Sequence, residues 1–188
     1  MAVAHAVSDE ALVRRIADGE RLAMQTLFGR HHVRIYRFAL RITGDQAAAE
    51  DVVSEVFFDV WRQADRFEGR SSVSTWLLGM ARFKALSTLR RRPEAPLQEE
   101  HAEIADESDD PEAAAQKKDK AAALRRCLAR LSPEHREVID LVYYHERSIH
   151  EVAEIVGVPE NTVKTRVFYA RKQLSELLRQ AGIDRGWP

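Results

Sequence analysis

Residues 157–174, GVPENTVKTRVFYARKQL, place basic, hydroxyl and aromatic side chains at a spacing that suits contact with a nucleic acid. At 3.6 residues per turn, the aliphatic residues fall on one face of the helix that this pattern predicts. On the opposite face, cations would meet phosphates, and amide or hydroxyl groups would reach base edges. Two bulky aromatics among charges suit that use, although single exposed apolar residues are common on any protein. The candidate DNA contacts are Asn161, Thr162, Lys164, Thr165, Arg166, Phe168, Tyr169, Arg171 and Lys172.

The longer stretch SIHEVAEIVGVPENTVKTRV, residues 148–167, has the spacing of a helix-turn-helix. Ala153 is small where two helices would cross closely, Gly157 can adopt the positive φ of the turn, and Val163 would pack the second helix on the first. Such a unit presents its second helix to the major groove of DNA. Helical hairpins with a glycine turn also occur in proteins that do not bind DNA, so the spacing alone leaves both interpretations open.

A second set of charged residues, Asp51, Glu55 and Asp59, recurs every four residues and forms a stripe along another predicted helix. Like charges at this spacing repel each other by a few tenths of a kcal/mol, so helix stability does not explain them. An acidic stripe is often only a solvated face. Beside Phe58 and Arg62, it would also suit docking on a protein partner.

A third candidate surface lies on the predicted helix 74–92, whose outer side carries Trp76, Phe83 and Arg90. An outward tryptophan with arginines further along the helix suits stacking on unpaired bases and gripping of the nucleic-acid backbone. The alternative is that Trp76 packs under the loop 66–74, because tryptophan is usually mostly buried.

The histidine spacing argues against a metallohydrolase. His31 and His32 are adjacent and therefore point to different faces of a helix, while His145 and His150, each followed by glutamate, are five residues apart rather than the four of an HExxH motif. Cys127 is the only cysteine, which excludes disulfides and cysteine-based metal sites within one chain. We therefore predict no metal and no cofactor.

The elements that must position these residues are all predicted to be helices, because glycine is sparse and strand-like alternation is almost absent. Asp45 and the pair Ser132-Pro133 are strong helix starts, while Gly44 and Pro93 mark helix ends. The predicted helices cover about 9–17, 21–42, 45–64, 74–92, 112–131, 133–145, 148–156 and 159–180.

The formal charge of −1 over 188 residues hides a strong asymmetry. Between Pro93 and Glu112 there are nine acidic residues and no Lys or Arg, so the rest of the chain carries +8 once nine negative charges are removed from −1. This stretch has no usable periodicity and is predicted to be a flexible linker between two all-helical domains. No apolar run approaches the roughly 20 residues that span a bilayer, and no apolar signal-peptide core is found, so a cytoplasmic protein without membrane insertion is expected.

These stretches resemble bacterial sigma factors. Residues 128–144, LARLSPEHREVIDLVYY, and 148–174 are similar to sigma region four, which reads the −35 promoter element. DQAAAEDVVSEVFFDVWRQADRF (45–67) and FEGRSSVSTWLLGMARFKALSTLRRR (67–92) resemble sigma region two in the compact extracytoplasmic-function (ECF) group of the sigma-70 family, which has only regions two and four. The resemblance implies an all-α chain with a region 2 helical bundle at 9–92, an acidic linker at 93–115 and a region 4 domain with the helix-turn-helix at 116–181.

The resemblance also implies partners and residue roles. Such a protein is not an enzyme: it binds the β′ clamp helices and the β flap of core RNA polymerase, recognises promoter DNA, and is controlled by an anti-sigma factor. The polymerase contact is expected at Asp51, Glu55, Phe58, Asp59 and Arg62. The −10 contact is expected at Phe67, Arg70, Ser71, Ser72, Ser74, Trp76, Arg82, Phe83, Arg90 and Arg91, and the −35 contact at the nine residues from Asn161 to Lys172 named above.

The chain departs from the usual family motifs in both regions. It has Val167-Phe168-Tyr169 where a serine- or arginine-rich run is usual, and Phe83 and Ser87 where asparagine and aspartate are common. The alternative function is a stand-alone helix-turn-helix regulator that binds operator DNA. That alternative explains the second half of the chain equally well but leaves the acidic stripe and the Trp76 face without a use.

Overall fold

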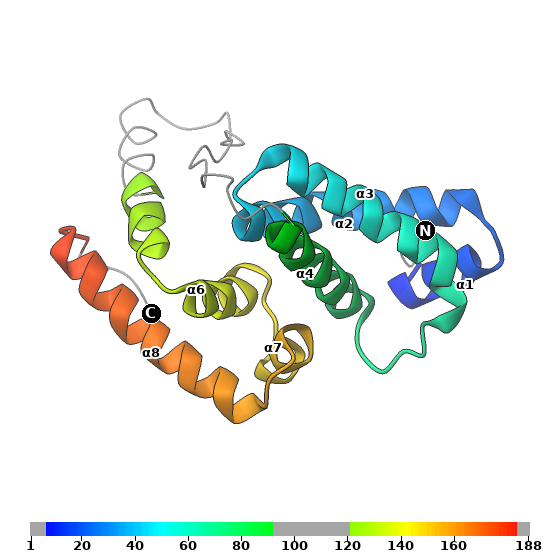
Figure 1. The fold of residues 1–188 in the computed structure, drawn as a ribbon. Coiled ribbons are helices and arrows are strands. Elements are labelled where there is room, and N and C mark those ends of the chain that lie inside the picture. The colour runs from blue at the N-terminus through cyan, green and yellow to red at the C-terminus, as the bar shows by residue number, and fades with distance from the viewer. Residues whose placement is uncertain (1–6, 92–120, 184–188) are drawn as a thin grey trace, which may run out of the picture. The chain divides into compact units, whose positions relative to one another are not determined.

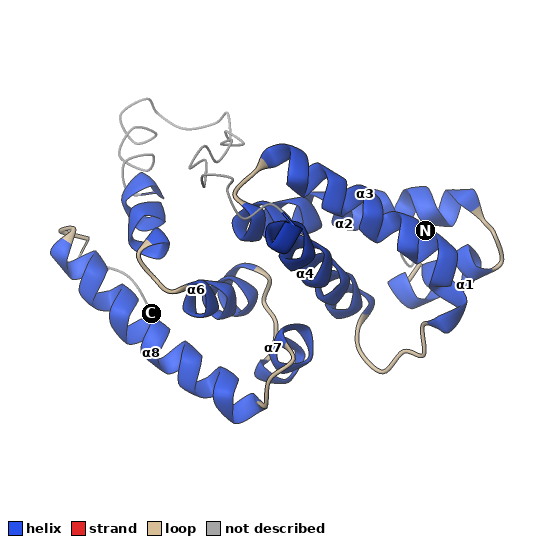
Figure 2. Ribbon diagram, viewed as in Figure 1, coloured by secondary structure: helices blue, strands red, loops and turns tan. Residues whose placement is uncertain are grey.

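The computed structural model describes residues 7–91 and 121–183, and this part of the chain consists of helices, turns and loops without any strand (Figure 1, Figure 2). The prediction of an all-α protein is confirmed. The described helices, apart from the end of the one predicted at 133–145, begin and end within a few residues of the predicted positions, because most of their ends carry local capping signals. The predicted start of the helix 112–131 lies outside the described residues.

The chain divides into two compact units. Among the described residues, the first consists of 7–91 together with 153–157, and the second of 121–152 and 158–183. The predicted linker 93–115 lies entirely outside the described residues, so the predicted domain boundaries stay a prediction.

The first unit is a bundle in which α2 lies against both α3 and α4, and α1 packs across α2. Its core consists of aliphatic and aromatic side chains, among them Leu12, Leu27, Ile35, Phe38, Val52, Val56, Leu77 and Leu78. The helices are α1 (Asp9–Ala17), α2 (Arg21–Thr43), α3 (Gln46–Gln63) and α4 (Val73–Arg91), with a 3₁₀ turn at Ala64–Arg66 after α3.

Side-chain caps set the helix starts in this unit. The Ser8 Oγ accepts a hydrogen bond of 3.2 Å from the Ala11 N–H, and the Asp45 Oδ1 accepts one of 2.6 Å from the Ala48 N–H. Each bond satisfies a backbone donor that the helix itself leaves unpaired. Gly44 ends α2 with a φ of 66°, a left-handed conformation that favours glycine.

The second unit is built on α8, which packs against α6. Residues 121–129 are also helical. Its core joins Cys127, Leu131 and Ile139 to the inner face of α8. The elements are α6 (Pro133–Ile139), a π-helical turn (Asp140–Tyr144) and α8 (Glu160–Gln180), and α7 (Ile149–Val156) begins in this unit.

The structure differs from the predicted helix 133–145 in its last turn, which is π-helical. The His145 N–H donates to the Asp140 carbonyl at 3.0 Å, five residues back rather than four. Glu146 follows with a φ of 54°, a left-handed conformation that is uncommon for a residue other than glycine. Periodicity cannot distinguish such a turn from a continuing α-helix, so the sequence carried no signal for it.

A polar cluster fastens α1 to α2. The Asp9 carboxylate accepts hydrogen bonds of 2.6 Å from the Arg30 Nη1 and 2.6 Å from the His31 Nε2, and His31 is buried. Burial raises the pKa of Asp9, but the hydrogen bonds from Arg30 and His31, with their charges, lower it by more, so it lies below its ordinary value of 3.8.

We predict that Asp9→Asn lowers the free energy of unfolding at pH 7 by about 1 to 2 kcal/mol, since it removes the charge from two charge-assisted hydrogen bonds. The Asp9 pKa is depressed in the folded chain. Its contribution is therefore complete above pH 3.8 and is lost as the pH falls through the lower folded value. The stability difference between the variant and the wild type, measured by urea denaturation, should shrink below pH 3.8. The exposed neighbour Glu10→Gln is the control, and a difference that is the same at pH 7 and pH 3 would contradict the role of the Asp9 charge.

Candidate nucleic-acid and protein interfaces

Helix α8 buries one stripe of apolar residues along its length. Val163, Ala170, Leu174, Leu177 and Leu178 are each at most 7% exposed. Because successive residues are rotated by about 100° around a helix, this stripe determines which side chains point away from the core.

Phe168 and Tyr169 lie on the outer side of α8, with 63% and 53% of their surfaces exposed. Their ring centroids are 5.4 Å apart in an edge-to-face arrangement. Exposed Lys164, Arg171 and Lys172 surround them, so an aromatic pair lies within a basic surface. Both features suit contact with DNA, since the cations meet phosphates and the rings meet sugars and thymine methyl groups.

All nine predicted −35 residues are accessible. Thr162 and Arg166 are half-buried, and the other seven are exposed. The Thr165 hydroxyl donates to the Asn161 carbonyl at 2.9 Å, so its oxygen remains as an acceptor towards the outside. Their contact with DNA stays a prediction.

Sequence reasoning missed a polar contact at the start of α8. The His150 Nδ1 lies 3.0 Å from the Glu160 Oε1, and the Lys164 Nζ lies 3.9 Å from the Glu160 Oε2. All three side chains are well exposed, so each pair contributes little to stability. The contact places a carboxylate beside the predicted base-reading residues, where it would disfavour phosphate and favour a base amino group.

The predicted acidic stripe runs along the outer side of α3. Asp51 and Glu55 are exposed and Asp59 is half-buried. Phe58 is 59% exposed, and the Arg62 guanidinium carbon lies 5.5 Å from its ring centroid, a cation–π contact. The five predicted polymerase-contacting residues are therefore all accessible on α3, and their contact with polymerase stays a prediction.

Lys84 of α4 reaches this stripe, which sequence reasoning did not foresee. Its Nζ lies 2.6 Å from the Asp59 Oδ2 and 3.2 Å from the Glu55 Oε2. Burial lowers the pKa of Lys84, but the hydrogen bonds to Asp59 and Glu55 raise it by more, so the ammonium group stays charged.

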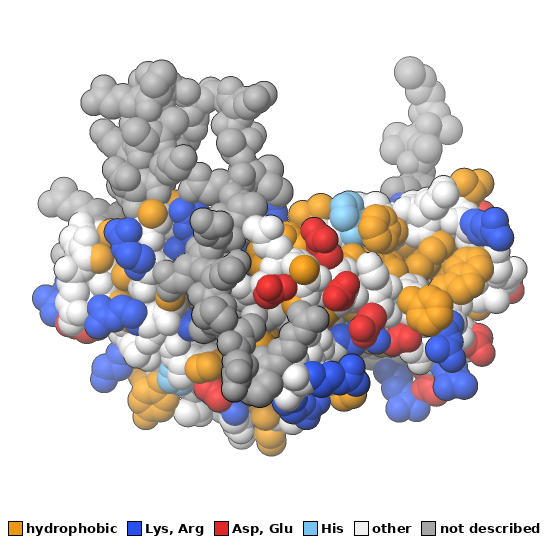
Figure 3. All heavy atoms as spheres, turned by 45° about the horizontal axis from the view of Figure 1, so that its top comes forward, with side chains coloured by type: hydrophobic (Ala, Val, Ile, Leu, Met, Phe, Trp, Pro, Cys, Tyr) orange, Lys and Arg blue, Asp and Glu red, His pale blue; other side chains and the backbone are white. Residues whose placement is uncertain are grey.

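Exposed aromatic residues extend the α3 surface towards α2. Trp61 is 40% and Phe28 is 41% exposed, and the Phe28 ring lies 4.8 Å from the Phe57 ring across the two helices. Figure 3 shows acidic side chains and, next to them, hydrophobic ones on the surface of the first unit. Trp61 follows Phe58 by three residues, and this helical spacing is the signal that could have added it to the candidate surface.

The predicted −10 surface is partly packed against itself. The Phe67 and Trp76 rings lie 4.9 Å apart and both are half-buried, so Trp76 packs against the loop and keeps part of its ring accessible. The Ser72 Oγ accepts from the Thr75 N–H at 3.2 Å and lies 3.2 Å from the Ser74 Oγ, which caps the start of α4. Of the other loop residues, Arg70 is exposed and Ser71 half-buried.

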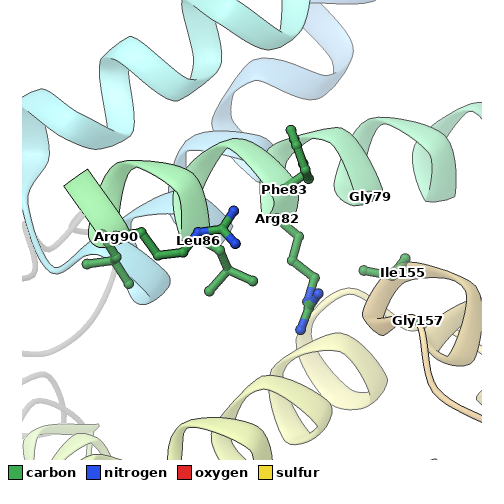
Figure 4. Close-up of a pocket in the computed structure, with 8 residues that line it drawn as sticks. Gly79, Arg82, Phe83, Leu86, Arg90, Ile155 and Gly157 are labelled. Atoms are coloured by element: carbon green, nitrogen blue, oxygen red, sulfur yellow. The ribbon is translucent and has the colours of Figure 1, made fainter.

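Along α4, Phe83 is the most exposed of the large hydrophobic residues described in the first unit, at 68%. Arg82 and Phe83 leave the helix in different directions, and Arg82 points to the same side as Leu86 (Figure 4). The Arg90 Nη2 donates to the Ser87 Oγ at 3.0 Å, and both Arg90 and Arg91 are exposed. An exposed ring on a helix that ends in two arginines suits single-stranded nucleic acid, whose bases stack while its backbone is held by cations.

Within residues 7–91 and 121–183, no group of three or more His, Cys, Asp or Glu side chains could hold a metal ion. The described helices also include none that is long and apolar enough to cross a bilayer.

Family models match both halves of the chain. The model described as Sigma-70 region 2 matches residues 27–93, and that described as Sigma-70, region 4 matches residues 121–174. The ECF RNA polymerase sigma factor SigL of Mycobacterium tuberculosis is 33% identical over 180 residues, which cover 93% of this chain and 99% of that protein. SigM of the same species is 33% identical over 177 residues, covering 93% of this chain and 86% of that protein.

Solved structures share the fold. The sigma factor RpoE from Bartonella quintana, determined in complex with the anti-sigma factor NepR, has a TM-score of 0.68 and 24% identity, and the match covers 86% of this chain and 98% of that chain. CnrH, determined in complex with the cytosolic domain of CnrY, has a TM-score of 0.67 and 24% identity, with coverage of 92% and 97%.

We predict that the double variant Phe168→Ala/Tyr169→Ala keeps the stability of the wild type to within about 0.5 kcal/mol, because both rings lie on the surface. Val163→Ala, at a fully buried position of the same helix, should instead lose about 1 to 2 kcal/mol. Chemical denaturation followed by circular dichroism measures both. A loss above 1 kcal/mol in the double variant would show that the two rings stabilise the fold and do not serve only to contact a partner.

Proposed function

The chain belongs to the ECF group of the sigma-70 family, and on this premise we propose that it binds core RNA polymerase and directs it to specific promoters by recognising their −10 and −35 elements. The observation that carries the proposal is a similarity that runs through both units, over 93% of the chain, to proteins named ECF RNA polymerase sigma factors. In addition, each unit has an exposed face that its own core does not use.

The polymerase contact is proposed on α3. The β′ clamp helices would contact five residues of α3, namely Asp51, Glu55, Phe58, Asp59 and Arg62. The second unit would contact the β flap. An acidic stripe beside an exposed ring can combine steering of a basic partner with burial of apolar surface. Trp61 and Phe28 extend this apolar surface.

The −35 contact is proposed on α8. Its N-terminal residues Asn161, Thr162 and Thr165 would reach base edges in the major groove, and its cations would hold the phosphates on either side. Phe168 and Tyr169 would lie against sugars and thymine methyl groups in place of the more polar residues usual in the family.

The −10 contact is proposed on α4 and the preceding loop. Phe67, Trp76 and Phe83 offer ring faces on which unpaired bases could stack, and Arg82, Arg90 and Arg91 offer charges for the backbone. Arg70, Ser71, Ser72 and Ser74 would line the loop that receives an extruded base of the non-template strand.

Domain boundaries are proposed at 9–92 for the region 2 domain, 93–115 for the linker and 116–181 for the region 4 domain. The nine acidic residues between Pro93 and Glu112 would repel free duplex DNA, so the chain without polymerase should bind DNA weakly.

We also propose that an anti-sigma factor controls this chain. The solved relatives RpoE and CnrH are both described in complexes, the first with an anti-sigma factor, and the exposed aromatic residues of both units would be available to such a partner.

The protein would act in the cytoplasm, where polymerase is, and through binding free energy rather than catalysis of its own.

Binding to core RNA polymerase tests the proposal. Charge reversal of the stripe by Asp51→Lys together with Glu55→Lys should weaken binding by about tenfold or more, because it places like charges against the partner. Glu10→Lys on α1 has the same charge change per site outside the stripe and should remain within about twofold of the wild type. Biolayer interferometry with immobilised core enzyme measures all three.

Two outcomes would contradict the proposal: wild-type chain that does not bind core polymerase, or stripe reversal that leaves the affinity unchanged. The stand-alone regulator would instead be favoured if the chain without polymerase bound a selected duplex with a Kd of about 10⁻⁸ M or tighter at physiological salt.

A further inference from the structure

Lys84 joins the two helices that carry the proposed polymerase and −10 contacts. It belongs to α4, yet its Nζ lies 2.6 Å from Asp59 and 3.2 Å from Glu55, both on α3. Only 16% of the Lys84 side chain is exposed, compared with 60% for Glu55. The ammonium group therefore lies largely inside the α3–α4 contact, while its carboxylate partners reach the surface.

This position changes the charge that α3 presents. Asp51, Glu55 and Asp59 bring three negative charges, and Lys84 and Arg62 bring two positive ones, so the surface carries a net charge near −1 rather than −3.

Lys84 is also close in sequence to the residues of α4 that are proposed to contact DNA. It directly follows Arg82 and Phe83, and Phe83 is 68% exposed. A rotation or slide of α4 that moved the Lys84 stem would therefore also move these two side chains. Lys84 is the only lysine among residues 7–91.

We propose that Lys84 is a positioning residue that couples polymerase docking on α3 to −10 recognition on α4. This inference rests on the proposed function. A basic group of polymerase that engages Glu55 or Asp59 competes with Lys84 for the same oxygens. Because a mostly buried ammonium group cannot be left without partners at low cost, α4 must adjust when α3 docks.

Because the coupling needs both partners of the contact, a change at Lys84 or at Asp59 should affect DNA opening. A purely structural ion pair would behave differently. Its loss would lower the stability of the first unit but would leave promoter opening unchanged once the folded protein is saturated with polymerase.

The experiment uses holoenzyme reconstituted from core polymerase and full-length chain, on a promoter fragment selected by the wild-type holoenzyme from a random library. Opening is read from 2-aminopurine fluorescence at the −10 element with polymerase saturating. Lys84→Met should reduce the opening equilibrium by about fivefold, which corresponds to about 1 kcal/mol. Lys84→Arg should restore it to within about twofold, and the exposed Arg14→Met on α1, which also removes one positive charge, should leave it unchanged.

Asp59→Asn should reduce opening to a similar extent, and adding Lys84→Met to it should have no further effect, because both changes break the same contact. Circular dichroism at the assay temperature confirms that each variant is folded, and Lys84→Gln, which keeps N–H donors, replaces Lys84→Met if the latter is not. The inference is overturned if these variants open the promoter as the wild type does, or if the effects of Lys84→Met and Asp59→Asn simply add. If instead the wild-type chain fails to bind polymerase or open any promoter, the proposed function itself fails.

Discussion

The functional surfaces of this chain depend on one constraint: each amphipathic helix must bury a single apolar stripe, and that burial fixes the direction of everything else on the helix. On α8, burial of Val163, Ala170 and Leu174 leaves Phe168 on the outside. A shift of one residue would rotate the helix by about 100° and carry the aromatic pair towards the core. The same holds for α3, where the buried Val52 and Val56 oblige Asp51 and Glu55 to face outward.

Those features could be predicted from the sequence because their signals are local. Asp45 and Ser132 cap their helices as expected, and the accessible face of α8 follows from its period alone. Contacts between distant residues could not be predicted in this way. The packing of Phe67 on Trp76 and the reach of Lys84 to Asp59 both depend on how separate elements meet, and the periodic pattern does not contain that information.

Charge is distributed so that the two units present different chemistry. The first unit presents carboxylates and aromatic rings on α3, where the positive charge of Lys84 offsets part of the negative charge. The second unit presents cations and aromatic rings on α8. Neither surface is explained by the stability of its own unit, since exposed charges and rings contribute little to folding. Both surfaces are explained if the chain binds a large protein through one unit and contacts a single promoter through both units.

The most direct test of that account is runoff transcription by core RNA polymerase on a library of promoter fragments, with and without the purified chain. We expect transcripts from a specific subset of fragments only when the chain is present. We further expect them to disappear when either Asp51 and Glu55 are reversed in charge or Phe168 and Tyr169 are truncated. Transcription that is the same with and without the chain on every fragment would contradict the account.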